Sequence, residues 1–404
     1  MKTLKQHIRK LETKDFEKLS EMTYSSRKLY NCALYLINNH FKETTFYLGY
    51  TQVYHLMKGT EHYKALNAKM AQQILRLVDK DFRSFFALLQ KKNRGEYKEQ
   101  IKPPRYKTKG SRFNLILPVD QISIIKNKLK ITKNLKIPFN YKILGKIKQV
   151  IIKPSKINNY FTIYIQYEEI PIVDPELNKL NYLSIDLGLN NLVACISNVG
   201  HSFIMNGKPL KAYNQFYNKQ KAKIQSELKT KNDKNWSNKL ERLTLNRSNY
   251  INNYLNQTVA HLIKQCLNLN IGNIVCGYNE LWKQEINIGK KNNQNFVNIP
   301  HGLFKQKLEN KCKEYSIKFI QQEESYTSKC SFLDKESVEK HETYLGKRVK
   351  RGLFKTSTNK LVNADVQAAA NILRKAVPKA QWVDGIEGCI VSPVKLKHCF
   401  NLQR

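Results

Sequence analysis

Apolar residues recur at helical spacing in two segments near the start of the chain. Between residues 63 and 90 they form one stripe with Lys and Arg on the opposite face, and its members are Met70, Ile74, Leu77, Val78, Phe85, Leu88 and Leu89. A second stripe runs through Leu29, Cys32, Ala33 and Ile37. These patterns predict a basic helical module over residues 18–100.

The pattern changes after the adjacent prolines of KPPRYK (102–107), which cannot continue a helix. From residue 113 to 172 short β-branched and aromatic runs alternate with Asn, Lys and Pro, and residues 3–10 form one more such run. We therefore expect a small β domain made of residues 1–17 and 101–176, closed as a barrel and interrupted by the helical module.

The remaining chain alternates buried strands with helices. YLSIDLGLNNLVACISN predicts two antiparallel strands of a buried sheet, and NIVCG (273–277) and SIKFIQQ (316–322) predict two more. Residues 301–315 and the Ala-rich run NADVQAAANILRKA predict helices, the second with Asn363 as its N-cap. The fold class is therefore α/β, with a mixed sheet, an insertion before the last helix and a tail from residue 379.

The charge balance indicates a polyanionic partner. Lys and Arg number 70 against 32 Asp and Glu, and the resulting charge of +38 repels itself unless nucleic acid neutralises it. The 22 Tyr and 17 Phe interleaved with it suit stacking on bases, although a ribosomal or histone-like binder would share this composition.

Other compositional features favour a cytoplasmic protein. No run of eighteen apolar residues occurs, the N-terminus lacks the apolar core of a signal peptide, and the eight cysteines form no CxxC pair, so we expect reduced thiols and no membrane. High Lys, Asn and Ile usage hints at a bacterial source.

Two aspartates suggest metal-dependent chemistry. Asp186 interrupts the apolar strand SIDLG, and Asp365 begins the Ala-rich helix. A few convergent carboxylates are enough to hold Mg²⁺, which can stabilise the charges that develop in phosphodiester hydrolysis. Taken singly, Asp186 could instead cap the turn at Gly188, and Asp365 could simply favour the helix N-terminus.

The sequence resembles the TnpB (OrfB) proteins of insertion sequences, relatives of type V CRISPR effectors. The motifs that carry the resemblance are SRKLYN (26–31), KPPRYK, SIDLGLNN, SYTSKCS (325–331) and NADVQAAANIL (363–373), and it extends from residue 1 to about 377. It implies a wedge-like β-barrel domain with an inserted helical recognition module, followed by an RNase H-like (RuvC) nuclease domain. The domains expected on this basis are 1–17 and 101–176 (wedge), 18–100 (recognition), 177–324 and 362–378 (RuvC), 325–361 (a degenerate zinc-ribbon-like insertion) and 379–404 (tail).

The resemblance also implies an Asp-Glu-Asp site that binds Mg²⁺, or Mn²⁺ in its place, with Asp186 and Asp365 as the two aspartates. The family's usual glutamate position is Gly277 here. Some branches carry the glutamate on the following strand, where Glu324 stands. We expect Glu324 to be the third acid, with Glu280 as the next candidate, while Glu323 would point to the opposite face and Glu285 lies in a polar loop.

A second departure concerns zinc. Of the four cysteines usual in the family's ribbon only Cys330 remains, because the other three positions are Leu333, Thr356 and Asn359. Cys330 and His341 together supply two ligands at most, so we expect no structural zinc. Packing then has to hold the insertion together, through residues such as Phe332, Leu333, Tyr344, Leu353 and Phe354, unless the insertion stays mobile.

The partners implied by the resemblance are a guide RNA and a double-stranded target DNA, bound by one copy of the chain. Candidate nucleic-acid contacts, each of which could equally be a solvated surface residue, are Arg27, Lys28, Tyr30, Arg105, Tyr106, Lys107, Trp282, Lys283, Lys290 and Lys291. Three functions follow: an RNA-guided nuclease that recognises a target-flanking motif, a guided DNA-binding protein that no longer cuts, and a strand-joining transposase. The retained aspartates favour the first.

Overall fold

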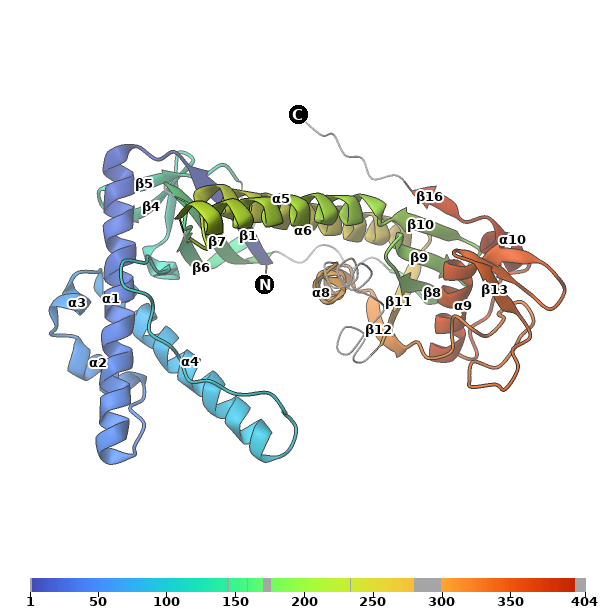
Figure 1. The fold of residues 1–404 in the computed structure, drawn as a ribbon, viewed down its shortest axis with the longest axis horizontal. Helices are drawn as coiled ribbons and strands as arrows, with labels where there is room; N and C mark the ends of the chain where they lie inside the picture. The colour runs from blue at the N-terminus through green and yellow to red at the C-terminus, as the bar shows by residue number, and fades with distance from the viewer. Residues whose placement is uncertain are drawn as a thin grey trace. The chain divides into compact units, whose positions relative to one another are not determined.

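The computed structural model describes residues 2–141, 143, 145–157, 159–169, 176–232, 234–279 and 299–396. The chain divides into two compact units, Met1–Ile170 and Pro171–Arg404 (Figure 1). The division falls close to the boundary expected between residues 176 and 177. Within the described residues no helix is both long and apolar enough to cross a membrane.

The first unit contains four helices between its first and second strands. They are α1 (Thr13–Thr44), α2 (Tyr50–Met57), α3 (Glu61–Lys64) and α4 (Ala68–Asn93). Leu29, Ala33 and Ile37 of α1 are buried at helical spacing, so one face of the helix enters the core. The helix begins well before this stripe because the preceding charged segment also packs inward: Leu19 is fully buried and the ring of Phe16 contacts Phe161.

The strands of the first unit form two separate antiparallel sheets. One has the order β1-β7-β6-β2, from β1 (Lys2–Arg9), β7 (Tyr160–Glu169), β6 (Gly145–Pro154) and β2 (Leu115–Pro118). The other consists of β3 (Ser123–Ile125), β4 (Lys128–Thr132) and β5 (Leu135–Pro138). Among the described residues these strands close no barrel, since β2 is short and the 3₁₀ turn η1 (Val119–Gln121) leads the chain into the second sheet.

The second unit is built on a sheet that is mixed, as the sequence predicts, and that has six strands within the described residues. Its order is β12-β11-β8-β9-β10-β16, from β8 (Asn178–Leu187), β9 (Asn191–Ser197), β10 (Ser202–Asn206), β11 (Ile271–Tyr278), β12 (Lys318–Glu323) and β16 (Val394–Leu396). β8, β9 and β10 are antiparallel neighbours, whereas β11 runs parallel to both β8 and β12.

Helices cover both faces of this sheet (Figure 1). On one face lie α6 (Asn238–Asn268) and α8 (His301–Glu314), and on the other lies α9 (Ala364–Ala376). The described residues also form α5 (Lys208–Asn232), which packs along α6, and the short α10 (Ile386–Val391). Ile185 and Ile274 face α6 and α8 in one core, while Ala194 and Val275 face α9 on the other side. Strand residues alternate between these faces, so Asp186 lies on the α9 side.

The insertion before α9 forms a small antiparallel sheet of β13 (Lys347–Lys350), β14 (Leu353–Lys355) and β15 (Leu361–Asn363). Of the residues expected to pack it, Phe354 and Phe332 are buried, and Leu333 packs against their cluster.

The expectation of a featureless tail from residue 379 is wrong for residues 379–396. These form α10 and β16, and β16 extends the sheet by pairing with β10. Residues 397–404 lie outside the described part of the chain.

Candidate active site

The two aspartates come from the centre of the sheet and from α9. Asp186 lies on β8 opposite Ala194 of β9, and two residues before it the Ser184 hydroxyl donates to the carbonyl of Ala369 in α9 at 2.6 Å. Asp365 is in the first turn of α9. The Asn363 side-chain oxygen accepts from the backbone N–H groups of Asp365 and Val366, both at 3.1 Å, which confirms the predicted cap and fixes where the helix begins.

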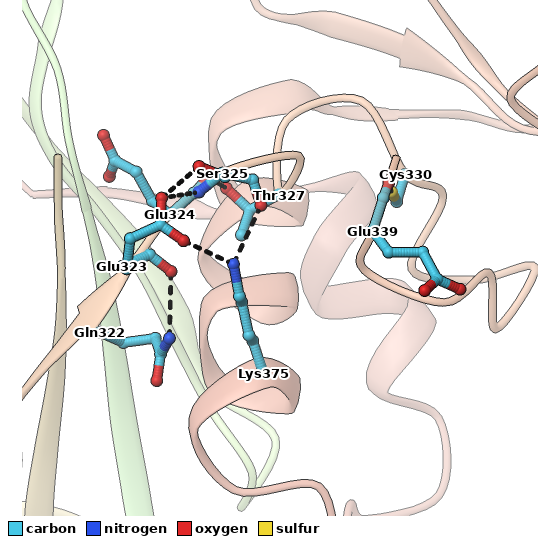
Figure 2. A network of polar contacts seen from close by, with 8 residues as sticks. All are labelled: Gln322, Glu323, Glu324, Ser325, Thr327, Cys330, Glu339 and Lys375. Carbon is cyan, nitrogen blue, oxygen red and sulfur yellow. Dashed lines mark hydrogen bonds and ion pairs between the residues drawn. The ribbon is translucent and has the colours of Figure 1, made fainter. Parts of the chain in front are cut away.

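Glu324 follows directly after β12. Its N–H donates to the carbonyl of Tyr278 at 3.2 Å, and its carbonyl accepts from the Thr327 hydroxyl at 2.8 Å, so its backbone is held at both sides. Glu323 is engaged elsewhere: its carboxylate accepts from Lys375 of α9 at 2.7 Å and from the N–H of Ser325 at 2.6 Å (Figure 2). Within this network, therefore, the Glu323 carboxylate forms an ion pair and the Glu324 carboxylate does not.

The Glu324 carboxylate occupies the space above Gly277. A Cβ atom added to Gly277 would lie 2.7 Å from Glu324 Oε2 and 2.7 Å from Ile372 Cδ1, closer than such atoms can approach. Gly277 sits next to Gln322 in the β11–β12 register, two residues before Glu324. A side chain from the end of β12 thus reaches the place where a residue of β11 would project.

Asp186 lies close enough to the other two acids to be affected by their charges. Burial raises the pKa of Asp186 well above its ordinary value, and the negative charges of Asp365 and Glu324 raise it further, while Arg348 opposes them. Burial and the charge of Glu323 raise the pKa of Glu324, against the nearby Lys305. A bound cation would favour the ionised form of Asp186.

Sequence reasoning missed two residues that hold Asp365. Arg348 of β13 lies 3.1 Å from Asp365 Oδ1, and Asn191, in the first position of β9, donates to Asp365 Oδ2 at 2.8 Å. The only signals for them were the basic run KRVKR and the pair of asparagines after SIDLG, neither of which indicates a contact with a residue so distant in sequence. Arg348 brings positive charge from the insertion to the acids.

The donor chemistry of the cluster fits a hard divalent cation. Asp186, Glu324 and Asp365 offer only carboxylate oxygens, which Mg²⁺ and Mn²⁺ prefer. No three metal-ligating residues among those described are already gathered as a coordination sphere. Arg348 contacts Asp365 Oδ1 and Asn191 contacts Asp365 Oδ2, so a cation bound here would share this carboxylate with both side chains.

The predicted nucleic-acid contacts differ in how exposed they are. Lys28, Arg105 and Tyr106 are exposed, with the Tyr106 hydroxyl accepting from Asn38 of α1 at 3.4 Å, and Arg27 is half-buried. Lys107 is fixed by contacts within the first unit. Its backbone N–H and carbonyl form two hydrogen bonds with the Asn31 side chain, both 2.8 Å, and its ammonium lies 4.3 Å from the ring centre of Tyr30.

The expectation for Tyr30 is wrong. Its side chain is fully buried and its hydroxyl donates to Asp81 of α4 at 2.7 Å, so it joins two helices instead of facing a ligand. Trp282, Lys283, Lys290 and Lys291 lie outside the described residues, as do Glu280 and Glu285.

Carboxylate hydrogen bonds hold the insertion together where the resemblance would place zinc ligands. Asp334 accepts from the N–H and the hydroxyl of Ser357, at 2.9 and 2.6 Å, which joins two turns of the insertion. Buried Glu336 accepts from the N–H groups of Ser331 and Leu345, at 2.6 and 2.9 Å. Cys330 donates to the carbonyl of Glu339 at 3.5 Å. The residues around Cys330 therefore do not fit a zinc ion.

Comparisons with known proteins find similar sequences, one of which covers 89% of this chain. Residues 163–283 match the OrfB_IS605 family, described as a probable transposase, and residues 301–372 match the Cas12f1-like TNB domain. The TnpB-like protein ORF457 of Acidianus two-tailed virus is 26% identical, with 89% of this chain and 83% of that protein covered.

A similar fold occurs in a cryo-EM structure of the Cas12f1-sgRNA-target DNA complex. The TM-score is 0.57 at 15% identity, and the match covers 89% of this chain and 83% of that one. Together, the family matches, the TnpB-like relative and this similar fold support the assignment of the chain to the TnpB/OrfB family.

Proposed function

We propose that the protein is an RNA-guided DNA endonuclease that hydrolyses phosphodiester bonds at a RuvC-type site formed by Asp186, Glu324 and Asp365. The observation that carries the proposal is the Glu324 carboxylate above Gly277, which supplies an acid at the position that β11 leaves empty. The electrostatic coupling of Asp186 to both other acids supports it. Buried like charges are costly, and a site that had lost its function would have no reason to keep them.

In this mechanism the chain's own residues hold and orient the charged groups. Asp186, Glu324 and Asp365 would hold Mg²⁺ or Mn²⁺, which stabilises the charge on the attacking and leaving oxygens of the phosphodiester. Asn191 orients the Asp365 carboxylate through its 2.8 Å hydrogen bond. Arg348 supplies a guanidinium beside the acids, where a phosphate can be bound.

The proposed partners are a transposon-derived guide RNA and double-stranded target DNA, bound by one copy of the chain. Family membership supports this, as does the charge of +38, which phosphate backbones would neutralise. Exposed Lys28, Arg105 and Tyr106 are candidates to contact nucleic acid, including the target-flanking motif. The domain assignment keeps residues 1–17 and 101–176 as the wedge domain and 18–100 as the recognition module.

The second candidate function is guided DNA binding without cutting. It is favoured by the glycine at 277 and by the direct contact between Arg348 and Asp365. In that contact a positively charged side chain already engages one of the carboxylates that would hold the metal. The two functions share the same partners and differ in whether magnesium supports hydrolysis.

The deciding experiment begins with the RNA that copurifies with the protein, which is sequenced to define guide and target. Cleavage of the matching duplex is then measured in Mg²⁺ for the parent and for Asp186→Ala, Glu324→Ala and Asp365→Ala. We expect each change to abolish cutting and to leave guided binding intact. Glu323→Ala is the matched control, because Glu323 pairs with Lys375 and should be largely dispensable for hydrolysis.

Three outcomes would contradict the proposal in different ways. A protein without copurifying RNA after lysis in moderate salt would argue against the guided function. A parent that binds its target and never cuts would establish the binding-only function. If Glu324→Ala cuts normally and Glu280→Ala is inactive, the third acid lies in the loop and not at the end of β12.

A further inference from the structure

The C-terminal segment from Gln381 to Leu396 contacts both the nuclease sheet and the insertion. On the sheet side, the Asn198 amide, at the β9–β10 turn, donates to the carbonyl of Gln381 at 2.9 Å, and the N–H of Val383 donates to the carbonyl of Asn198 at 3.1 Å. Further along, β16 pairs with β10 in parallel register, Phe203 opposite Val394. The segment is therefore attached to the sheet at both of its ends.

Trp382 connects this attachment to the insertion. Its ring meets the ring of Phe332 edge to face, with 4.9 Å between the centroids, and Phe332 in turn lies 5.3 Å from the Arg374 guanidinium of α9. Ile390 of α10 is fully buried in the same apolar cluster, next to Phe354 and Val362. An ion pair between Lys360 and Glu387 adds a polar contact between the insertion and α10.

The insertion sheet leads from this cluster to the acids. Val362 of β15 is paired with Phe354 of β14, and Phe354 is paired with Arg348 of β13. Arg348 then reaches Asp365 at 3.1 Å. β13 itself is exposed along its length, so the buried Phe354 beneath it, and the cluster that holds Phe354, are what fix its position.

We infer that the C-terminal segment, and Trp382 in particular, is a positioning element of the nuclease that holds the insertion sheet so that Arg348 stays against Asp365. This inference rests on the proposed function. Trp382 touches none of the three acids and acts through Phe332 and the strands that carry Arg348.

The test compares Trp382→Ala with the conservative Trp382→Phe and with Val391→Ala. Val391 lies on α10 and is 42% exposed, so it controls for a change in the same segment that leaves the cluster intact. Displacing a positioned group by about 1 Å can cost on the order of 100-fold in rate. We expect Trp382→Ala to cut the matched target 10-fold to 100-fold more slowly, with guided binding unchanged, and Trp382→Phe to restore most of the rate.

Hydrogen exchange supplies a readout that does not depend on cutting. In Trp382→Ala, backbone amides of Lys347–Lys350 should exchange faster, while those of β8 and β11 keep their protection. In Val391→Ala neither set should change. For Trp382→Ala, unaltered exchange in Lys347–Lys350 would overturn the inference, and so would cutting at the parent rate. A general loss of guided binding and of amide protection in β8 would also overturn it, because the segment would then serve folding alone. If the parent protein does not cut at all, the proposed function fails, and the exchange result alone decides whether Trp382 positions the insertion.

Discussion

Replacing Gly277 by alanine tests whether Glu324 is the third acid without altering any acidic residue. The added methyl would lie 2.7 Å from both Glu324 Oε2 and Ile372 Cδ1, and its other near neighbour, the carbonyl of Ile185 at 3.5 Å, is ordinary contact. The two side chains, or the backbone of Gly277, therefore have to shift. The carboxylate is the more easily displaced of the two, because Ile372 is fully buried in the core of α9.

The expected effect is larger on cutting than on stability. Overpacking by one methyl group costs about 1–3 kcal/mol, and in a unit of this size each kcal/mol lowers the melting temperature by about 2–4 °C. Moving a catalytic carboxylate by about 1 Å lowers the rate by roughly 100-fold. Gly277→Ala should therefore melt a few degrees lower, bind guide and target normally, and cut about two orders of magnitude more slowly.

Single-turnover cleavage of the matched duplex measures this rate, with a thermal melt alongside. Gly302→Ala is the control, since nothing lies within 4 Å of the added methyl in α8 and the change should be harmless. The double variant Gly277→Ala/Ile372→Val removes one of the two clashes, because valine lacks the Cδ1 atom. If it regains stability and stays slow, the displaced Glu324 causes the defect. Cutting by Gly277→Ala at the parent rate would refute the reasoning and remove Glu324 from the site.

Three further predictions concern α9 and the insertion. Asn363→Ala removes the cap that accepts two N–H groups and should cost about 1 kcal/mol in thermal or denaturant unfolding, with Asn363→Ser recovering most of it; an unchanged midpoint would mean that the cap is not needed. Elemental analysis of washed protein should find zinc far below one per chain, and chelators should leave the melt unchanged, because Leu333, Thr356 and Asn359 are not ligands. Burial alone would raise the pKa of Asp334, yet the hydrogen bonds from Ser357 help to lower it below its ordinary value. The contribution of Asp334 to stability is therefore present above that ordinary value and is lost as pH falls through the depressed pKa. Asp334→Asn should flatten this acid limb in a pH series of melts, and an identical limb in the variant would count against the role of Asp334.

The sequence predicts the second unit best where hydrophobic pattern and chemistry coincide. A charge inside the apolar strand SIDLG, and an Ala-rich helix that begins with Asn363 and Asp365, leave few structural alternatives. Strand alternation also separates Glu323 from Glu324, and the structure gives them different partners. The proposed relocation of the third acid comes from the family resemblance, and strand alternation then favours Glu324 over Glu323.

Other features depend on contacts that no local pattern reveals. Tyr30 lies in a helix with basic neighbours, yet α4 and Phe113 cover it, and amphipathic spacing does not show how wide the covered face is. Residues 379–396 carry no recognisable motif, and their strand β16 pairs with a sheet edge that exists only once the rest of the sheet has formed. Arg348 meets Asp365 through the fold of the insertion, seventeen positions earlier in the chain.

The shared space above Gly277 also constrains how such a site can evolve. A chain with a long acidic side chain on β11 and another at the end of β12 would place two carboxylates in one volume, where both packing and charge repulsion oppose them. An ancestor with its acid on β11 could therefore not simply gain Glu324 first and lose the older acid later. The exchange requires either near-simultaneous substitution or passage through a non-cutting intermediate that is retained for guided binding. Among relatives, we accordingly expect a small residue at one of these two positions whenever the other carries the acid.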